Sequence, residues 1–67
     1  MRILVSRGTW KYSEDVFRYI QASFPRNQVR AEDLSKDPFV VDIPGVGREA
    51  VKMINDIHGV QASAYKD

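Results

Sequence analysis

The sequence predicts an α+β domain in which a four-stranded antiparallel sheet carries two helices on one face. Two segments place apolar residues at helical spacing, and short runs of β-branched and aliphatic residues flank each of them. The resulting order is strand, helix, strand, strand, helix, strand. A chain of 67 residues has the length of one domain with a thin core. We therefore expect residues 1–67 to form a single domain.

The first strand is expected at residues 2–6, which are mostly aliphatic or β-branched and end shortly before a glycine. The first helix is expected to begin with Ser13 as its N-cap, and Tyr12 has the spacing of a hydrophobic staple with Phe17. Pro25 ends this helix, because proline disfavours helical geometry in the residue before it. The apolar stripe of this helix consists of Val16, Phe17, Ile20 and Phe24.

The second half of the chain repeats this alternation. Residues 27–32 alternate polar and apolar side chains, as a half-buried edge strand does, and residues 39–43 are stronger strand material. A second helix is expected at residues 48–58, and Gly59 follows it as a left-handed C-terminal cap. Residues 60–65 then return as an edge strand. The apolar stripe of the second helix consists of Ala50, Val51, Ile54 and Ile57.

The composition excludes several kinds of site. The chain has no cysteine, so it has neither a disulfide nor a thiolate metal site, and its one histidine, His58, is expected to cap the second helix. No serine or threonine lies in a nucleophile motif, so we expect a non-enzymatic protein without a cofactor or a metal. The apolar runs are too short for a membrane span, and we expect a cytoplasmic location. Loose segments are predicted only at residues 34–37 and at Lys66 and Asp67.

The charges are uneven along the chain, although the net charge of +1 gives no general attraction for polyanions. Up to Arg30 there are six basic and two acidic residues, whereas from Ala31 onward there are four basic and seven acidic residues. The N-terminal half is therefore a candidate basic side.

The predicted order is the split βαβ, or ferredoxin-like, arrangement, in which the first and third strands are central and one sheet face stays open. Within this arrangement the chain resembles the RNA-recognition-motif family in three segments. They are residues 3–5, residues 14–17 at the start of the first helix, and residues 49–59, where glycine follows the second helix. The resemblance implies binding of RNA by aromatic side chains that project from the two central strands.

Strand parity predicts which side chains project from the open face. Asp42 avoids the helix-covered face, so Val40 also points outward, and Leu4 does the same in the first strand. The side chains that alternate with these point into the core: Ile3, Val5, Phe39, Val41 and Ile43. The stacking positions therefore hold Leu4, Val40 and Pro38, none of which is aromatic. Such an aliphatic patch suits a protein partner, and two scattered surface aliphatics are the alternative interpretation.

The loop at residues 7–12 is a second candidate site, because it combines two cations, Arg7 and Lys11, with two aromatic side chains, Trp10 and Tyr12. Such a loop either stacks bases and holds phosphates or anchors a protein interface. The alternative is that Trp10 and Tyr12 only close one end of the core.

A third candidate lies before the second helix, where Gly45 and Gly47 offer backbone N–H groups to an anion and Arg48 adds a positive charge. The alternative is a tight turn from strand to helix. In that case Glu49 supports the helix end and competes with any bound phosphate.

Two functions remain. The first is a protein-binding regulator or inhibitor, similar in size and style to those that phages and mobile elements encode against host machinery. Its expected interface residues are Leu4, Arg7, Trp10, Lys11, Tyr12 and Val40. The alternative is binding of RNA or single-stranded DNA through the 7–12 loop and the basic N-terminal half, which salt would weaken. A homodimer through the open face is a further hypothesis, because a small core gains from added burial.

Overall fold

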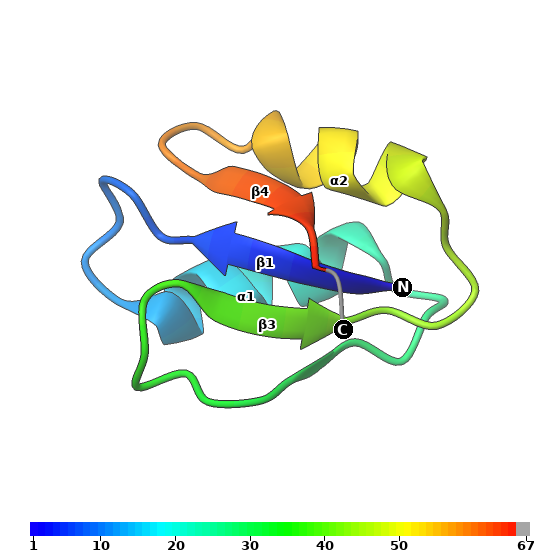
Figure 1. The fold of residues 1–67 in the computed structure, drawn as a ribbon, viewed down its shortest axis with the longest axis horizontal. Coiled ribbons are helices and arrows are strands. Elements are labelled where there is room, and N and C mark those ends of the chain that lie inside the picture. The colour runs from blue at the N-terminus through cyan, green and yellow to red at the C-terminus, as the bar shows by residue number, and fades with distance from the viewer. Residues whose placement is uncertain (66–67) are drawn as a thin grey trace.

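The computed structural model describes residues 1–65, and it has a four-stranded antiparallel sheet and two helices, as the α+β class predicts. Figure 1 labels both helices and the strands β1, β3 and β4. The strands are β1 (Arg2–Ser6), β2 (Arg30–Ala31), β3 (Phe39–Asp42) and β4 (Gln61–Ala64), and the helices are α1 (Ser13–Ser23) and α2 (Arg48–Asn55). Within the described residues no helix is both long enough and apolar enough to cross a membrane. Lys66 and Asp67, predicted to be loose, lie outside the described residues.

The strands are arranged in the order β2-β3-β1-β4, and each neighbouring pair is antiparallel. The two strands predicted to be central, β1 and β3, are central. Helix α1 connects β1 to β2, and β3 lies between these two strands in the sheet. Helix α2 connects β3 to β4, and β1 lies between these two strands. This arrangement is compatible with a ferredoxin-like fold.

One hydrophobic core fills the space between the sheet and the helices. The inward side chains of β1 and β3 are buried, as strand parity predicted, and the helices contribute their apolar stripes. The core residues from these elements are Ile3, Val5, Val16, Ile20, Phe39, Val41, Ala50 and Ile54. In Figure 1, α1 crosses behind β1 and β3 while α2 runs alongside β4. The opposite face of the sheet is left without a helix.

The start of α1 differs from the prediction. Tyr12 is the N-cap residue and makes no side-chain capping bond, whereas Ser13 is the first helical residue and is buried. The prediction of Ser13 as N-cap was therefore wrong, because an N-cap residue has non-helical backbone geometry and Ser13 is already helical. The staple of Tyr12 with Phe17 was also misplaced, since a staple needs the residue before the N-cap.

β2 is much shorter than the predicted 27–32 strand. The chain leaves α1 in a turn in which the Asn27 N–H donates to the Phe24 carbonyl at 3.1 Å. The Asn27 side-chain amide donates to the Pro44 carbonyl at 2.9 Å, which fixes this turn against the loop after β3. Val29 is nevertheless buried, as the alternating pattern predicted, and within the predicted 27–32 strand only Arg30 and Ala31 form a strand that pairs with β3.

α2 ends at Asn55, three residues before its predicted end at His58. The chain tightens into turns in which Ile57 N–H donates to the Ile54 carbonyl and Val60 N–H donates to the Ile57 carbonyl, both at 3.1 Å. These turns bring Ile57 into the core. His58 therefore lies in the following loop and not at the helix end, and Gly59 has the expected left-handed φ of +84° in that loop.

The remaining boundaries are close to the prediction. β3 and β4 are shorter than the predicted 39–43 and 60–65 strands, although Ile43 and Val60 are buried. The 34–37 segment lies in a turn held by hydrogen bonds. The Asp33 carboxylate accepts from the Ser35 backbone N–H at 3.0 Å and also from the Ser35 hydroxyl, and this hydroxyl bond, followed by the N–H bond, lowers the pKa of Asp33. The Asp37–Pro38 peptide bond that follows is cis.

Candidate functional site

Leu4 and Val40 lie opposite each other on the open face of the sheet. They are register partners in the β1–β3 pair, and both side chains are half-buried. Parity therefore placed these two residues correctly, and the sheet brings them together. Two shallow hollows meet at this point, and Leu4 and Pro38 line both of them.

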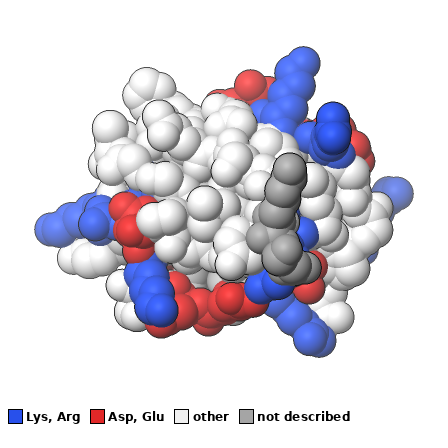
Figure 2. Space-filling view, in the orientation of Figure 1, with Lys and Arg blue, Asp and Glu red and all other residues white. Residues whose placement is uncertain are grey.

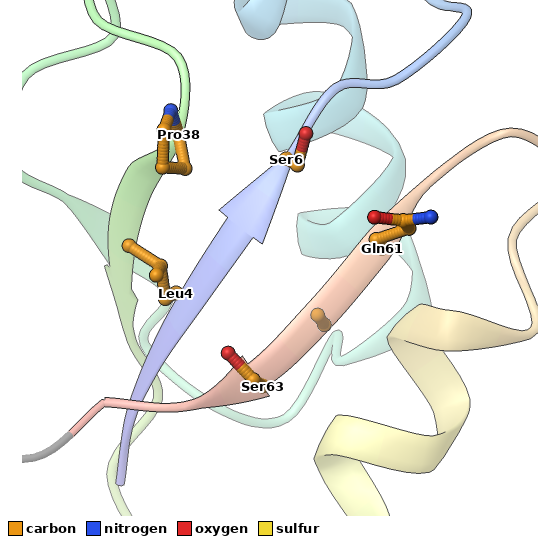
Figure 3. Close-up of a pocket in the computed structure, with 6 residues that line it drawn as sticks. Leu4, Ser6, Pro38, Gln61 and Ser63 are labelled. Atoms are coloured by element: carbon orange, nitrogen blue, oxygen red, sulfur yellow. The ribbon is translucent and has the colours of Figure 1, made fainter.

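The first hollow has a volume of about 250 Å³ and lies across β1 and β4. Figure 3 shows Leu4 and Pro38 on one side of it, Gln61 and Ser63 on the other, and Ser6 at its end. The lining thus combines an aliphatic edge with short, uncharged side chains that donate and accept hydrogen bonds.

The second hollow, of about 260 Å³, lies on the β3 side of Leu4. Tyr65 forms one wall, and its side chain is 39% exposed. The other lining residues are Glu32, Asp33, Lys36, Pro38, Phe39 and Val40. An aliphatic floor with a charged rim is the arrangement that protein interfaces share.

The charged groups at the edge of this face pair with one another. The Arg2 guanidinium bonds the Glu32 carboxylate and lies 5.0 Å from the centre of the Tyr65 ring. The N-terminal ammonium lies 3.9 Å from the Asp42 carboxylate. Figure 2 shows the result: an uncharged surface over the sheet with Lys, Arg, Asp and Glu around its edges. The Arg2 guanidinium and the N-terminal ammonium thus already have carboxylate partners, which reduces the attraction of this edge for a phosphate backbone.

Arg7 holds the 7–12 loop in place. Its Nη1 donates to the carbonyls of Trp10 at 2.8 Å and Lys11 at 3.2 Å, and its Nε lies 3.6 Å from Asp37 Oδ2. The Arg7 backbone N–H also donates to Asp37 Oδ1 at 3.0 Å. Because Asp37 precedes Pro38, these bonds connect the loop to a wall of both hollows. Arg7 therefore bonds within the chain, to the loop's own carbonyls and to Asp37.

Trp10 contacts both α1 and the loop that follows α2. Its indole N–H donates to the His58 carbonyl at 2.8 Å, and its ring packs edge-on against the Tyr19 ring of α1, with centroids 5.9 Å apart. The backbones meet at the same place, where the Thr9 N–H donates to the Gly59 carbonyl at 3.2 Å. A Cβ on Gly8 would lie 1.9 Å from that oxygen, so the close approach requires glycine. These contacts match the alternative in which Trp10 closes one end of the core.

Lys11 and Tyr12 are both exposed. The Lys11 ammonium lies 5.5 Å from the centre of the Tyr12 ring, which is 52% exposed. Of the four predicted loop residues, Arg7 and Trp10 therefore bond carbonyls of the chain, whereas Lys11 and Tyr12 face solvent.

The candidate anion site before α2 holds a carboxylate of the chain itself. Glu49 Oε1 accepts from the N–H of Gly47, the N-cap residue, at 3.0 Å. The Gly47 N–H, followed by the backbone N–H of Glu49, lowers the pKa of Glu49. Gly45 supplies a left-handed φ of +81° to the turn. Arg48 lies beside the site, but a phosphate would have to displace Glu49.

Asn55 has a structural role that the sequence analysis missed. Its Nδ2 donates to the Ala62 carbonyl at 2.8 Å, and its Oδ1 accepts from the Ala62 N–H at 2.7 Å. The side-chain amide therefore pairs with the outer edge of β4 as a neighbouring strand would. No sequence signal marks this role, because it depends on how α2 lies beside β4.

The chain matches no family model, no curated protein and no solved structure. No family match therefore supports the resemblance to RNA-recognition motifs. Within residues 1–65, no group of three or more His, Cys, Asp or Glu side chains is placed to hold a metal ion.

Proposed function

We propose that this chain is a protein-binding module with a regulatory or inhibitory role, and that the open face of its sheet is the interface. The observation that carries the proposal is the pair of hollows that meet at Leu4 and Pro38 on a face without a helix. The strand order and the single helix-covered face also support a ferredoxin-like fold, in which this face is free to take a partner.

The size of the hollows favours a macromolecular partner over a small ligand. Ligand pockets usually enclose about 300–1,000 Å³ and bury most of the ligand. The hollows of about 250 and 260 Å³ are smaller and shallow, so each accommodates one or two side chains of a partner. Interfaces gain most of their affinity where a few such anchors enter fitted sockets.

Charge favours protein over nucleic acid. The Arg2–Glu32 pair and the N-terminus–Asp42 pair leave the edge of the face close to neutral. The centre consists of Leu4 and Val40 with uncharged polar neighbours, which matches the apolar centre and polar rim of a protein interface.

The test is affinity capture from a lysate of the source organism, with substitutions that separate the two faces. Leu4→Glu places a charge at the junction of the hollows and should abolish capture of a specific protein. Met53→Glu is the matched control, because Met53 is an exposed apolar residue of α2, 44% exposed, and should leave capture intact. Circular dichroism and thermal unfolding establish that each variant is folded.

A second variant guards against misfolding of Leu4→Glu. Val40→Thr keeps the β-branched shape and replaces one methyl with a hydroxyl, so the strand is retained while the hollow on the β3 side becomes more polar. Capture that survives both open-face substitutions in folded protein would refute the proposed interface. Concentration-dependent sedimentation that Leu4→Glu abolishes would identify the partner as a second copy of the chain.

Binding of RNA or single-stranded DNA is the second candidate, and two cation–aromatic pairs favour it. Lys11 with Tyr12 and Arg2 with Tyr65 each present a ring beside a positive charge. The test is fluorescence anisotropy of labelled single-stranded RNA and DNA at low and moderate salt. Binding that weakens as salt rises and is lost in a Lys11→Glu, Tyr12→Ala variant would favour this function over the first.

A further inference from the structure

We propose that the groove between α2 and the outer edge of β4 binds an extended acidic peptide segment, which pairs with β4 as an additional strand. The groove has a volume of about 380 Å³. Its lining residues are Arg48, Val51, Lys52, Asn55 and Ala64. It lies at the edge of the sheet and shares no lining residue with the hollows of the open face. The proposal is therefore independent of the function assigned to that face.

Backbone geometry supplies the first argument. Ala62 directs its N–H and C=O away from β1 toward Asn55, whereas the Tyr65 N–H donates to the Arg2 carbonyl of β1 at 3.0 Å. Backbone groups alternate in direction along a strand, so the N–H and C=O of Ala64 also point away from β1. Ala64 lines the groove, and none of the described residues bonds these outward groups. Unpaired groups at a sheet edge are a template for another strand.

Asn55 determines where such a strand can pair. Its side chain already occupies both outward groups of Ala62, so the edge is closed at that position. The next outward position along β4 is Ala64, which remains open. An incoming segment can therefore bond at Ala64 and place an apolar side chain against Val51, which is half-buried. Backbone bonds with alternate side-chain contacts are the mode of binding called β-augmentation.

Charge identifies the occupant. Arg48 and Lys52 lie one turn apart on α2, and both are exposed. Neither forms an ion pair with another described residue, and no acidic residue lines the groove. A second copy that paired through its own β4 edge would bring the same two cations into the groove and be repelled. A nucleic acid would match the charge but carries no amide groups at strand spacing. An acidic peptide has carboxylates that can pair with Arg48 and Lys52, and it has backbone amides that can bond Ala64.

The experiment uses nuclear magnetic resonance of the ¹⁵N-labelled 67-residue chain. The probe is the synthetic peptide acetyl-Glu-Val-Glu-Val-Glu-Val-amide, and the control peptide has Lys in place of each Glu. We expect the acidic peptide to shift the amide resonances of Val51 and Ala64 and to slow hydrogen exchange at Ala64. The basic peptide should do neither, and added salt should weaken the binding.

Two sets of substitutions test the two arguments separately. The double change Arg48→Glu and Lys52→Glu should weaken binding of the acidic peptide at least about fivefold, because two attractions become repulsions. The matched control is Arg18→Glu with Arg26→Glu, which changes the net charge equally at exposed positions outside the groove lining. This control should bind as the unmodified protein does.

Ala64→Pro tests the backbone bond. Proline removes the N–H that points into the groove, and at an edge strand it leaves the bonds to β1 in place. We expect a folded variant in which binding is lost. Retention of binding in folded Ala64→Pro would overturn the proposal.

Three other outcomes would also overturn it. They are peptide shifts centred on Leu4 and Val40 instead of the groove, dimerisation through Ala64 in free protein, and equal shifts of the groove by single-stranded RNA. If Leu4→Glu loses partner capture but binds the peptide normally, the open face and the groove are separate binding surfaces. Normal partner capture in folded Leu4→Glu, together with peptide binding that the Arg48→Glu and Lys52→Glu change weakens, would reject the open face and retain the groove.

Discussion

Replacing Asn55 by Ala tests how α2 and β4 are held together. The substitution removes two hydrogen bonds, of 2.7 and 2.8 Å, between the Asn55 side chain and Ala62. A typical intramolecular bond contributes about 0.5–1.5 kcal/mol, and the exposure of Asn55 favours the lower end of that range. Alanine recovers about 0.5 kcal/mol through its better helix propensity. Two bonds of about 0.5 kcal/mol each, less this gain, leave an expected fall of about 0.5 kcal/mol in the free energy of unfolding, which lowers Tm by about 2–4 °C.

Urea unfolding measures the loss of stability, and hydrogen exchange at the Ala62 amide tests its cause. In Asn55→Ala the Ala62 N–H should exchange as fast as the unbonded N–H of Ala64. Asn55→Asp is the matched control, because its carboxylate still accepts from the Ala62 N–H but cannot donate to the carbonyl. That variant should lose stability while Ala62 stays protected. Unchanged protection of Ala62 in Asn55→Ala would refute the role assigned to Asn55.

Three further predictions concern the loop and the helix end. Trp10→Phe loses the bond to the His58 carbonyl and should lower the free energy of unfolding by about 1 kcal/mol, measured in urea; no loss would show that the bond contributes nothing. Gly8→Ala should cost about 2 kcal/mol or more in thermal unfolding, because φ is +54° and the new Cβ meets Gly59, and full stability would contradict that approach. The pKa of Glu49 should lie below the ordinary glutamate value. The charged carboxylate therefore stabilises α2 fully above that ordinary value, and this stabilisation should be lost as pH falls through the lowered pKa. Carbon-13 titration measures this pKa, and an ordinary value would contradict the bond to the helix N-cap.

The candidate site was predictable where a residue's role follows from alternation along a strand. A carboxylate at position 42 and the two-residue period were enough to place Leu4 and Val40 on the open face. The roles of Arg7 and Trp10 were not predictable in the same way. A loop with a cation and an indole looks the same in sequence whether its polar atoms face solvent or, as here, bond carbonyls of the same chain.

Local pattern in the sequence determined the α+β class, the central positions of β1 and β3, and the set of side chains in the core. Apolar periodicity determines which face of each element is buried, and in a small domain that decides how elements pack. The tertiary structure alone decided where α2 stops, how short β2 is, and which groups cover or leave open the edge of β4. These features depend on hydrogen bonds between residues far apart in the chain, such as Asn27 with Pro44 and Trp10 with His58. Such bonds form only after the core has brought the segments together, so no local pattern encodes them.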